Sequence, residues 1–247
     1  MRVRAVSLDL FDTLVDIHMD RLPLVEIGGR RIPSTYGLLH AASVHFHGLD
    51  FESFARELGK IDREHRERLR RDLRELPTLE RFRLLGRGIG LPSEEMAHVL
   101  TETHMGELRK HVTFVPEHAE LLARLHRRVR LGLCSNFSHS DTARAILSEA
   151  GLLEHFDALV ISMDVGFYKP RREMFQSAIE GLGVAPHELL HVGDSLEADV
   201  AGGAGLEIPT VWLTRRVANP AVQLEAWAGP KPSHVIADLS ELESLVA

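Results

Sequence analysis

The stretch VRAVSLDLFDTLVD, residues 3–16, decides how the rest of the chain is interpreted. Its first six residues form a short, mostly apolar run that is rich in small and β-branched side chains. Such a run is typical of a buried parallel strand. Asp9 follows directly, and Asp12 and Thr13 come shortly after it. Because an open parallel sheet binds its ligands at the carboxyl ends of its strands, we expect these polar residues to lie at a functional site.

Five further short apolar runs predict strands of the same kind, at residues 129–134, 158–161, 189–192, 208–213 and 234–237. Helical patterns lie between them, at residues 117–128, 140–150, 171–180 and 196–205, with proline or glycine at several of their ends. From residue 113 onward strands and helices alternate. This order predicts an α/β fold with a Rossmann-like parallel sheet, covered on both faces to give three layers.

Residues 16–112 have a different pattern, because they contain no comparable buried strand. Helical patterns occupy residues 40–58, 61–76, 79–85 and 93–108, and Gly28-Gly29 between two short runs predicts a small hairpin at residues 24–33. We therefore predict an α/β core made of residues 1–15 and 113–247, interrupted by a mostly helical insert at residues 16–112.

The composition of the chain argues against several classes of function. With 247 residues, 44% of them hydrophobic, the chain is globular for most of its length. Its 29 Lys and Arg against 36 Asp and Glu give a net charge of -7, which argues against nucleic acid or anionic lipid as partners. No apolar run is long enough for a membrane span, and the first residues indicate a strand rather than a signal peptide. One cysteine, Cys134, excludes an internal disulfide, so we expect a cytoplasmic location. The oligomeric state is left open.

Polar residues also follow the other predicted strands. Ser135 and Asn136 follow the second strand, Lys169 comes after the third, and Asp194 follows the fourth, with Asp199 a little further on. Each residue alone is a common turn or capping residue. Acids at two separate strand ends, together with a lysine after a third strand, exceed what capping requires and predict one shared site.

This arrangement resembles the haloacid dehalogenase (HAD) superfamily. The resemblance is carried by four segments, DLFDTLVD at Asp9, LCSNFS at Ser135, YKPRREMF at Lys169 and GDSLEADV at Asp194. It covers the predicted core at both ends of the chain, and the helical insert lies where that superfamily's C1-type cap lies. The resemblance implies a hydrolase acting on a small phosphorylated metabolite.

The resemblance also implies a role for each matched residue. Asp9 is the expected nucleophile, because a carboxylate can form a covalent intermediate that water later hydrolyses. Mg²⁺ is the expected cofactor, since it cancels the repulsion between this carboxylate and phosphate. The implied ligands are Asp9, the backbone carbonyl of Phe11 and Asp194, with Asp199 orienting them. The hydroxyls of Thr13 and Ser135, the amide of Asn136 and the ammonium of Lys169 are expected to bind phosphate.

One position departs from the superfamily's phosphatases, which carry a second Asp two residues after the nucleophile as general acid and base. Here that position is Phe11, and the next acid is Asp12. Losing a general acid typically costs about 10²–10⁴ in rate. Four explanations remain open: Asp12 replaces the missing acid, a residue of the insert replaces it, the leaving group is good, or the phospho-aspartate is long-lived.

Three functions are weighed. Metal-free 2-haloacid dehalogenases also carry an aromatic residue at the position of Phe11, but they lack the pair matched by Gly193 and Asp194, so we favour a Mg²⁺-dependent phosphatase. A catalytically weakened binding or regulatory protein is the third hypothesis.

Whether Arg30 or Arg31, after the predicted hairpin turn, contacts an anionic substrate is left open.

Overall fold

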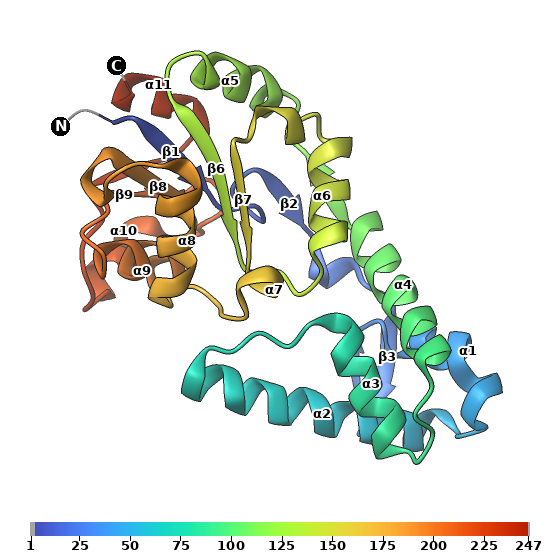
Figure 1. The fold of residues 1–247 in the computed structure, drawn as a ribbon. Coiled ribbons are helices and arrows are strands. Elements are labelled where there is room, and N and C mark those ends of the chain that lie inside the picture. Colours follow the sequence, from blue (N-terminus) through green and yellow to red (C-terminus); the bar gives the residue numbers. More distant parts are fainter. Residues whose placement is uncertain (1–2, 247) are drawn as a thin grey trace. The chain divides into compact units, whose positions relative to one another are not determined.

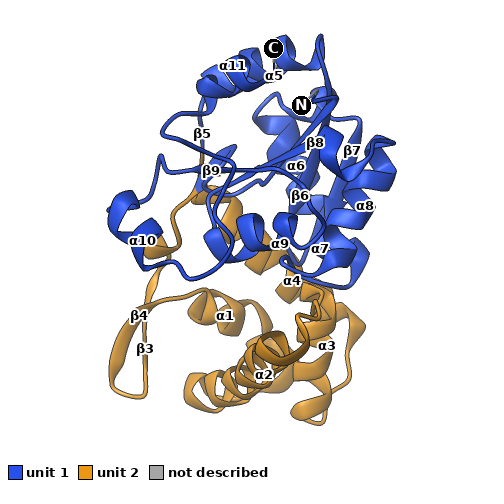
Figure 2. Ribbon diagram, turned by 90° about the vertical axis from the view of Figure 1, so that its left-hand side faces the viewer, with its two compact units in different colours: residues 1–16, 114–247 blue, residues 17–113 orange. Residues whose placement is uncertain are grey.

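The computed structural model of the protein describes residues 3–246. The chain divides into two compact units, coloured separately in Figure 2. Unit 1 consists of residues 1–16 and 114–247, and unit 2 consists of residues 17–113.

Unit 1 is built on a six-stranded parallel sheet with the strand order β10-β9-β8-β1-β6-β7 (Figure 1). This sheet confirms the predicted α/β Rossmann-like fold. Strands β1, β8 and β9 are buried along their whole length, as expected of a parallel sheet flanked by helices, whereas the edge strand β10 exposes His234 and Val235. The strands are β1 (Ala5–Leu8), β6 (Arg130–Ser135), β7 (Ala158–Ile161), β8 (Leu189–Gly193), β9 (Thr210–Leu213) and β10 (His234–Ile236).

The central place of β1 explains how the site residues meet. Strand β1 pairs with β6 on one side and with β8 on the other, and Leu8 lies level with both Leu133 and Val192. The three strands therefore end together. Asp9, the segment that begins at Ser135 and the segment that begins at Asp194 all leave the sheet at the same edge.

The helices of unit 1 follow the predicted alternation, and α8 packs on the sheet through Met174, Phe175, Ala178 and Leu182. The predicted helix at 196–205 begins as a π-helical turn (Leu196–Val200) before α9. The helices are α5 (Glu117–His126), α6 (Ser140–Glu149), α7 (Ser162–Val165), α8 (Arg172–Leu182), α9 (Ala201–Ala204), α10 (Pro220–Ala226) and α11 (Leu242–Leu245).

Unit 2 contains a hairpin and a helical core. Strands β3 (Leu24–Ile27) and β4 (Arg30–Pro33) form the predicted hairpin, with both turn glycines at positive φ, as a tight two-residue turn requires. Its helices are α1 (Tyr36–His47), α2 (Phe51–Asp72), α3 (Thr78–Gly88) and α4 (Glu94–Lys110). They bury one apolar cluster, made of Leu39, Phe54, Leu58, Phe82, Leu85, Met96, Ala97 and Leu100.

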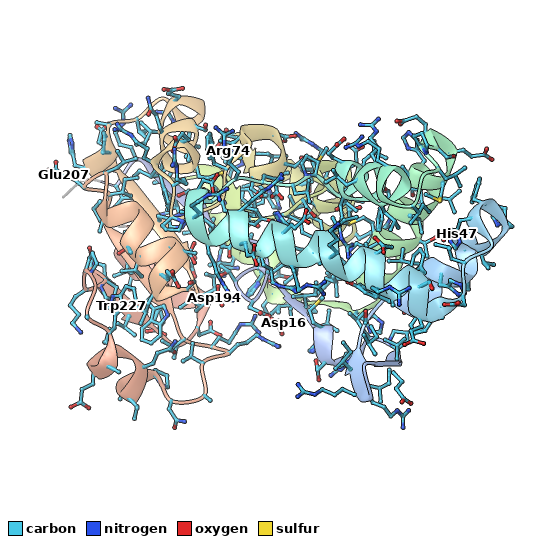
Figure 3. The ribbon with its side chains drawn as sticks, turned by 90° about the horizontal axis from the view of Figure 1, so that it is seen from below. Asp16, His47, Arg74, Asp194, Glu207 and Trp227 are labelled. Atoms are coloured by element: carbon cyan, nitrogen blue, oxygen red, sulfur yellow. The ribbon has the colours of Figure 1, made fainter. Side chains whose placement is uncertain are left out.

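The predicted helices at residues 40–58 and 61–76 were wrong in their bounds, because α1 ends at His47 and α2 then runs without interruption from Phe51 to Asp72. Residues 40–58 do not form one helix, because Gly48 adopts a left-handed conformation that ends α1 after His47 (labelled in Figure 3). Asp50 then caps α2, its carboxylate accepting a hydrogen bond from the Ser53 N–H at 2.7 Å. Strands β2 (Val15–Ile17) and β5 (Val112–Phe114) were not predicted, because three residues are too few for a periodic signal.

Across the part of the chain that the structure describes, no helix combines the length and the apolar character needed to cross a bilayer.

Candidate active site

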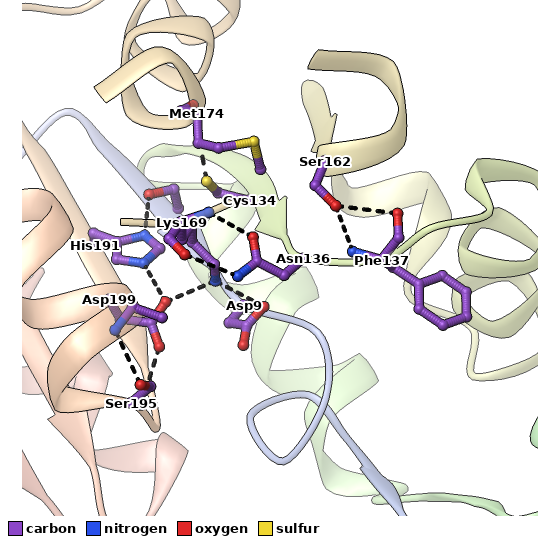
Figure 4. Close-up of polar contacts among 12 residues, drawn as sticks. Asp9, Cys134, Asn136, Phe137, Ser162, Lys169, Met174, His191, Ser195 and Asp199 are labelled. Carbon is purple, nitrogen blue, oxygen red and sulfur yellow. Dashed lines mark hydrogen bonds and ion pairs between the residues drawn. The ribbon is translucent and has the colours of Figure 1, made fainter. Parts of the chain in front are cut away.

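Lys169 joins two of the predicted site acids. Its side chain is 1% exposed, and its ammonium lies 2.9 Å from Asp9 Oδ1 and 2.7 Å from Asp199 Oδ1 (Figure 4). Burial alone would lower the pKa of Lys169, but the charges of Asp199 and Asp9 raise it above its ordinary value. The ammonium is therefore fixed beside Asp9 and stays charged.

Asn136 holds the backbone on which Lys169 stands. Its side-chain Oδ1 accepts a hydrogen bond from the Lys169 N–H at 2.7 Å, and its Nδ2 donates to the Lys169 carbonyl at 3.2 Å. The residue was predicted to bind phosphate through an amide. The structure adds a positioning contact, which couples the end of β6 to the segment that carries the lysine.

Asp199 is held from several sides. Oδ1 accepts from Lys169 and lies 2.9 Å from His191 Nε2, while Oδ2 accepts from the Ser195 N–H at 3.0 Å. Burial would raise the pKa of this carboxyl, but the Lys169 charge and the His191 hydrogen bond hold it well below its usual value. A carboxylate with both oxygens engaged is suited to orient its neighbours.

Gly193 makes room for that carboxylate. A Cβ at this position would overlap Cγ and Oδ2 of Asp199. A side chain here would displace Asp199 and its contact to Lys169. The glycine of the GDSLEADV segment is therefore needed for space, since its backbone lies in an ordinary strand.

Asp194 completes a cluster of three carboxylates. Asp9, Asp194 and Asp199 each offer an oxygen within 4.8 Å of the others. Burial, and then the charges of Asp9 and Asp199, raise the pKa of Asp194 to about 7. Three carboxylates against the single ammonium of Lys169 leave a formal excess of two negative charges. Closely spaced oxygens with that excess fit a hard divalent cation such as Mg²⁺.

Two of the expected phosphate ligands are hydroxyls without protein partners. Thr13 and Ser135 are 0% and 1% exposed, and their hydroxyl oxygens make no hydrogen bond to the described residues. Buried hydroxyls normally find a partner, so each of these two hydroxyls is available to donate to a bound group.

Phe11 and Asp12, which follow Asp9 closely in the sequence, have different neighbours in the structure. The Phe11 ring packs against Phe137, with ring centroids 4.9 Å apart. Asp12 adopts a left-handed conformation, and its carboxylate lies 2.9 Å from the Arg216 guanidinium, which also contacts Asp16 (labelled in Figure 3) at 3.1 Å. The Asp12 carboxylate is therefore paired with Arg216, and its role as the missing proton donor stays a prediction.

Sequence reasoning did not find every residue of this network. His191 was interpreted as a buried core residue with satisfied hydrogen bonds, and it is 0% exposed and hydrogen-bonded. Its contact with Asp199, and the contributions of Ser7, Phe137 and Arg216, were not predicted. One signal was available, because Ser7 lies two residues before Asp9, and alternate residues of a strand share one face.

The fold and the site together define an α/β core with an aspartate at the end of its central strand. A sequence model of the haloacid dehalogenase-like hydrolases matches residues 3–206. The chain belongs to this family, and the resemblance inferred from the four segments is confirmed.

Individual relatives agree with the family assignment. The chain is 32% identical over 149 residues to pyrimidine 5'-nucleotidase YjjG of Escherichia coli, covering 60% of this chain and 63% of that protein. The chain thus spans less than two thirds of the length of this relative. Among solved structures, a 2-haloacid dehalogenase from Pseudomonas syringae matches 99% of this chain and 98% of its own, with a TM-score of 0.68 and 18% identity. Magnesium-bound YfnB from Bacillus subtilis matches 100% and 99%, with a TM-score of 0.58 and 19% identity.

Proposed function

We propose that the protein hydrolyses a small phosphomonoester through a covalent aspartyl-phosphate on Asp9, with Mg²⁺ as cofactor. One observation carries this proposal: the ammonium of Lys169 is fixed between Asp9 and Asp199, beside the carboxylate of Asp194. The relatedness to a nucleotidase, and the magnesium in the structure of YfnB, support the same direction.

The proposed roles follow from the contacts. A carboxylate oxygen of Asp9 attacks phosphorus, and the bond from phosphorus to the leaving oxygen breaks. Lys169 stabilises the negative charge of the transferring group, while Thr13 and Ser135 donate hydrogen bonds to its oxygens. The leaving oxygen takes a proton from solvent. Water then attacks the phosphorus of the intermediate and gives a proton back to solvent, the bond from phosphorus to the Asp9 oxygen breaks, and phosphate is released.

The cation would be held by the carboxylates of Asp9 and Asp194 and by the carbonyl of Phe11. When bound, it would supply positive charge against phosphate. Asp199, whose oxygens already accept hydrogen bonds, would orient the other groups. We also propose that unit 2, which corresponds closely to the predicted insert, acts as a cap domain that selects the substrate.

Metal removal gives a first test. In EDTA we expect phosphatase activity to be lost, and added Mg²⁺ to restore it and raise the melting temperature, because a ligand that binds only the folded state stabilises it by about 2.7 kcal/mol at 100 times its Kd. Asp194→Asn should weaken both responses. The measurements are phosphate release and thermal unfolding across a Mg²⁺ titration.

The alternative functions are outcomes of the same test. Turnover that persists in EDTA, with chloride released from 2-chloropropionate, would assign the dehalogenase reaction, whose leaving halide needs no proton. Absence of turnover on sugar phosphates, nucleotides, phosphoglycolate and 2-chloropropionate would favour the binding or regulatory protein.

The aromatic residue Phe11, at the position where the family's phosphatases carry an acid, leads to a second prediction. With no acid at position 11, we expect aryl phosphates, whose leaving groups need little protonation, to react much faster than alkyl phosphates. Phe11→Asp should raise alkyl phosphate turnover, by up to about the 10²–10⁴ that a general acid contributes. The measurement is kcat/KM across esters of graded leaving-group pKa.

Phe11→Asn is the matched control, because it has nearly the same shape as the Asp variant but no acidic proton to transfer. It should keep the steep dependence on the leaving group. Equal rates for aryl and alkyl esters in the wild-type protein would show that another residue supplies the proton.

A further inference from the structure

A chain of buried polar side chains leads away from Asp9 through Lys169 and Asp199 to His191 (Figure 4). The Ser7 hydroxyl lies 2.8 Å from His191 Nδ1, and His191 Nε2 lies 2.9 Å from Asp199 Oδ1. Asp199 and Asp9 then share the ammonium of Lys169. Ser7 and His191 are both 0% exposed, so solvent does not compete for these contacts.

The sheet sets the register of this chain. Ser7 and His191 are directly paired residues of the parallel neighbours β1 and β8. Ser7 lies two residues before Asp9, so the two side chains leave β1 on the same face. The imidazole also meets Phe175 edge-on, with centroids 5.0 Å apart and ring planes at 88°. The ring is therefore held by packing and by hydrogen bonds.

The hydrogen bond between His191 and Asp199 has one consistent direction. Asp199 is charged and can only accept, so Nε2 of His191 carries a proton and donates. The hydroxyl of Ser7, which can donate or accept, is the partner of Nδ1 on the other side of the ring. Asp199 Oδ1 thus accepts from both Lys169 and His191.

The two hydrogen bonds that Asp199 Oδ1 accepts determine how the Lys169 ammonium is shared between Asp199 and Asp9. A hydrogen bond from His191 satisfies part of the negative charge on Asp199 Oδ1 and keeps that carboxylate from turning. The Lys169 ammonium then remains available to Asp9 and to the transferring group. Without the His191 donor, Asp199 would reorient and hold the ammonium more strongly.

We propose that His191 is a positioning residue for catalysis, which sets Asp199 and through it Lys169 against Asp9, and that the Ser7 hydroxyl holds the imidazole ring in the orientation that makes this possible. The proposal rests on the hydrolase function proposed above. It differs from a packing role because it depends on one nitrogen atom of the ring.

Two amide variants separate that nitrogen from the other. In His191→Gln the amide nitrogen can reach the place of Nε2 and still donate to Asp199, whereas in His191→Asn it reaches only the place of Nδ1. Both variants lose the ring and its contact with Phe175, so their melting temperatures should be similar. We expect His191→Asn to lower kcat by about 10–100-fold, the usual cost of removing an orienting partner, with little change in KM. His191→Gln should recover most of kcat.

Equal kcat and KM values in the Asn and Gln variants would overturn the proposal, while leaving the hydrolase function intact if the wild-type protein turns over. Absence of turnover in the wild-type protein would instead refute the proposed function.

A measurement without substrate tests the hydrogen-bond direction independently. Imidazole nitrogen NMR of the wild-type protein should show a proton on His191 Nε2, and Ser7→Ala should change the signal of Nδ1. A ring protonated at Nδ1 alone would overturn the proposal whether or not a substrate is found.

Discussion

Asp9→Asn is expected to lower turnover by at least about 10⁴-fold, because an amide cannot form the covalent intermediate and removal of a catalytic nucleophile has effects of this size in other hydrolases. Folding should survive. Burial and the nearby Asp199 raise the pKa of Asp9, even with Lys169 beside it, so the charged form is unfavourable there. Replacing it with a neutral side chain of the same shape should leave the melting temperature unchanged or higher. Steady-state phosphate release and thermal unfolding measure the two effects.

A loss of turnover without a loss of thermal stability makes the Asp9 experiment specific. A misfolded variant would lose both activity and stability. Asp141→Asn is the matched control, since Asp141 is an exposed acid in the first turn of α6 and should tolerate the change in both assays. Near wild-type turnover in Asp9→Asn would remove Asp9 as the nucleophile.

Lys169→Met should impair both activity and folding. The substitution keeps a long side chain but leaves Asp9 and Asp199 buried without their shared cation. Removing one partner of a buried ion pair typically costs about 3–5 kcal/mol of unfolding free energy. The rate should fall by about 10²–10³ or more, as observed when an electrostatic stabiliser of a transition state is removed. Denaturant unfolding and phosphate release measure the losses.

The stability loss in Lys169→Met should depend on pH. The pKa of Asp199 is lowered in the folded wild-type protein, so this group stabilises the fold above its unfolded pKa and loses that contribution as pH falls. Without Lys169 the lowering largely disappears. The difference between the two proteins should therefore be largest near neutral pH and shrink in acid.

A control for the lysine experiment is Lys60→Met, because Lys60 is an exposed residue of α2. That variant should change stability by no more than about 1 kcal/mol. A Lys169→Met protein as stable and as active as wild type would contradict the assigned role of the ammonium.

Much of the core could be predicted from local pattern, and the reason is burial. Parallel strands covered on both faces read as short apolar runs, so all six strands of the sheet were found within a few residues of their ends. The glycine pair in the hairpin is equally local, since a tight turn needs positive φ. The insert was harder, because the left-handed Gly48 that separates α1 from α2 lies in a continuous helical pattern.

The same distinction between local sequence pattern and tertiary contact applies to the site. Strand ends and their polar residues are local features, so the sequence by itself determined that Asp9, Ser135, Lys169 and Asp194 belong to one edge of a parallel sheet. Tertiary structure decided what those side chains contact. Only the register of β1 against β8 places Ser7 beside His191, and only the turn after β8 brings Asp199 over Gly193 to both His191 and Lys169. Hydrogen bonds act over about 3 Å, and pairing across strands nearly 200 residues apart sets which atoms come that close.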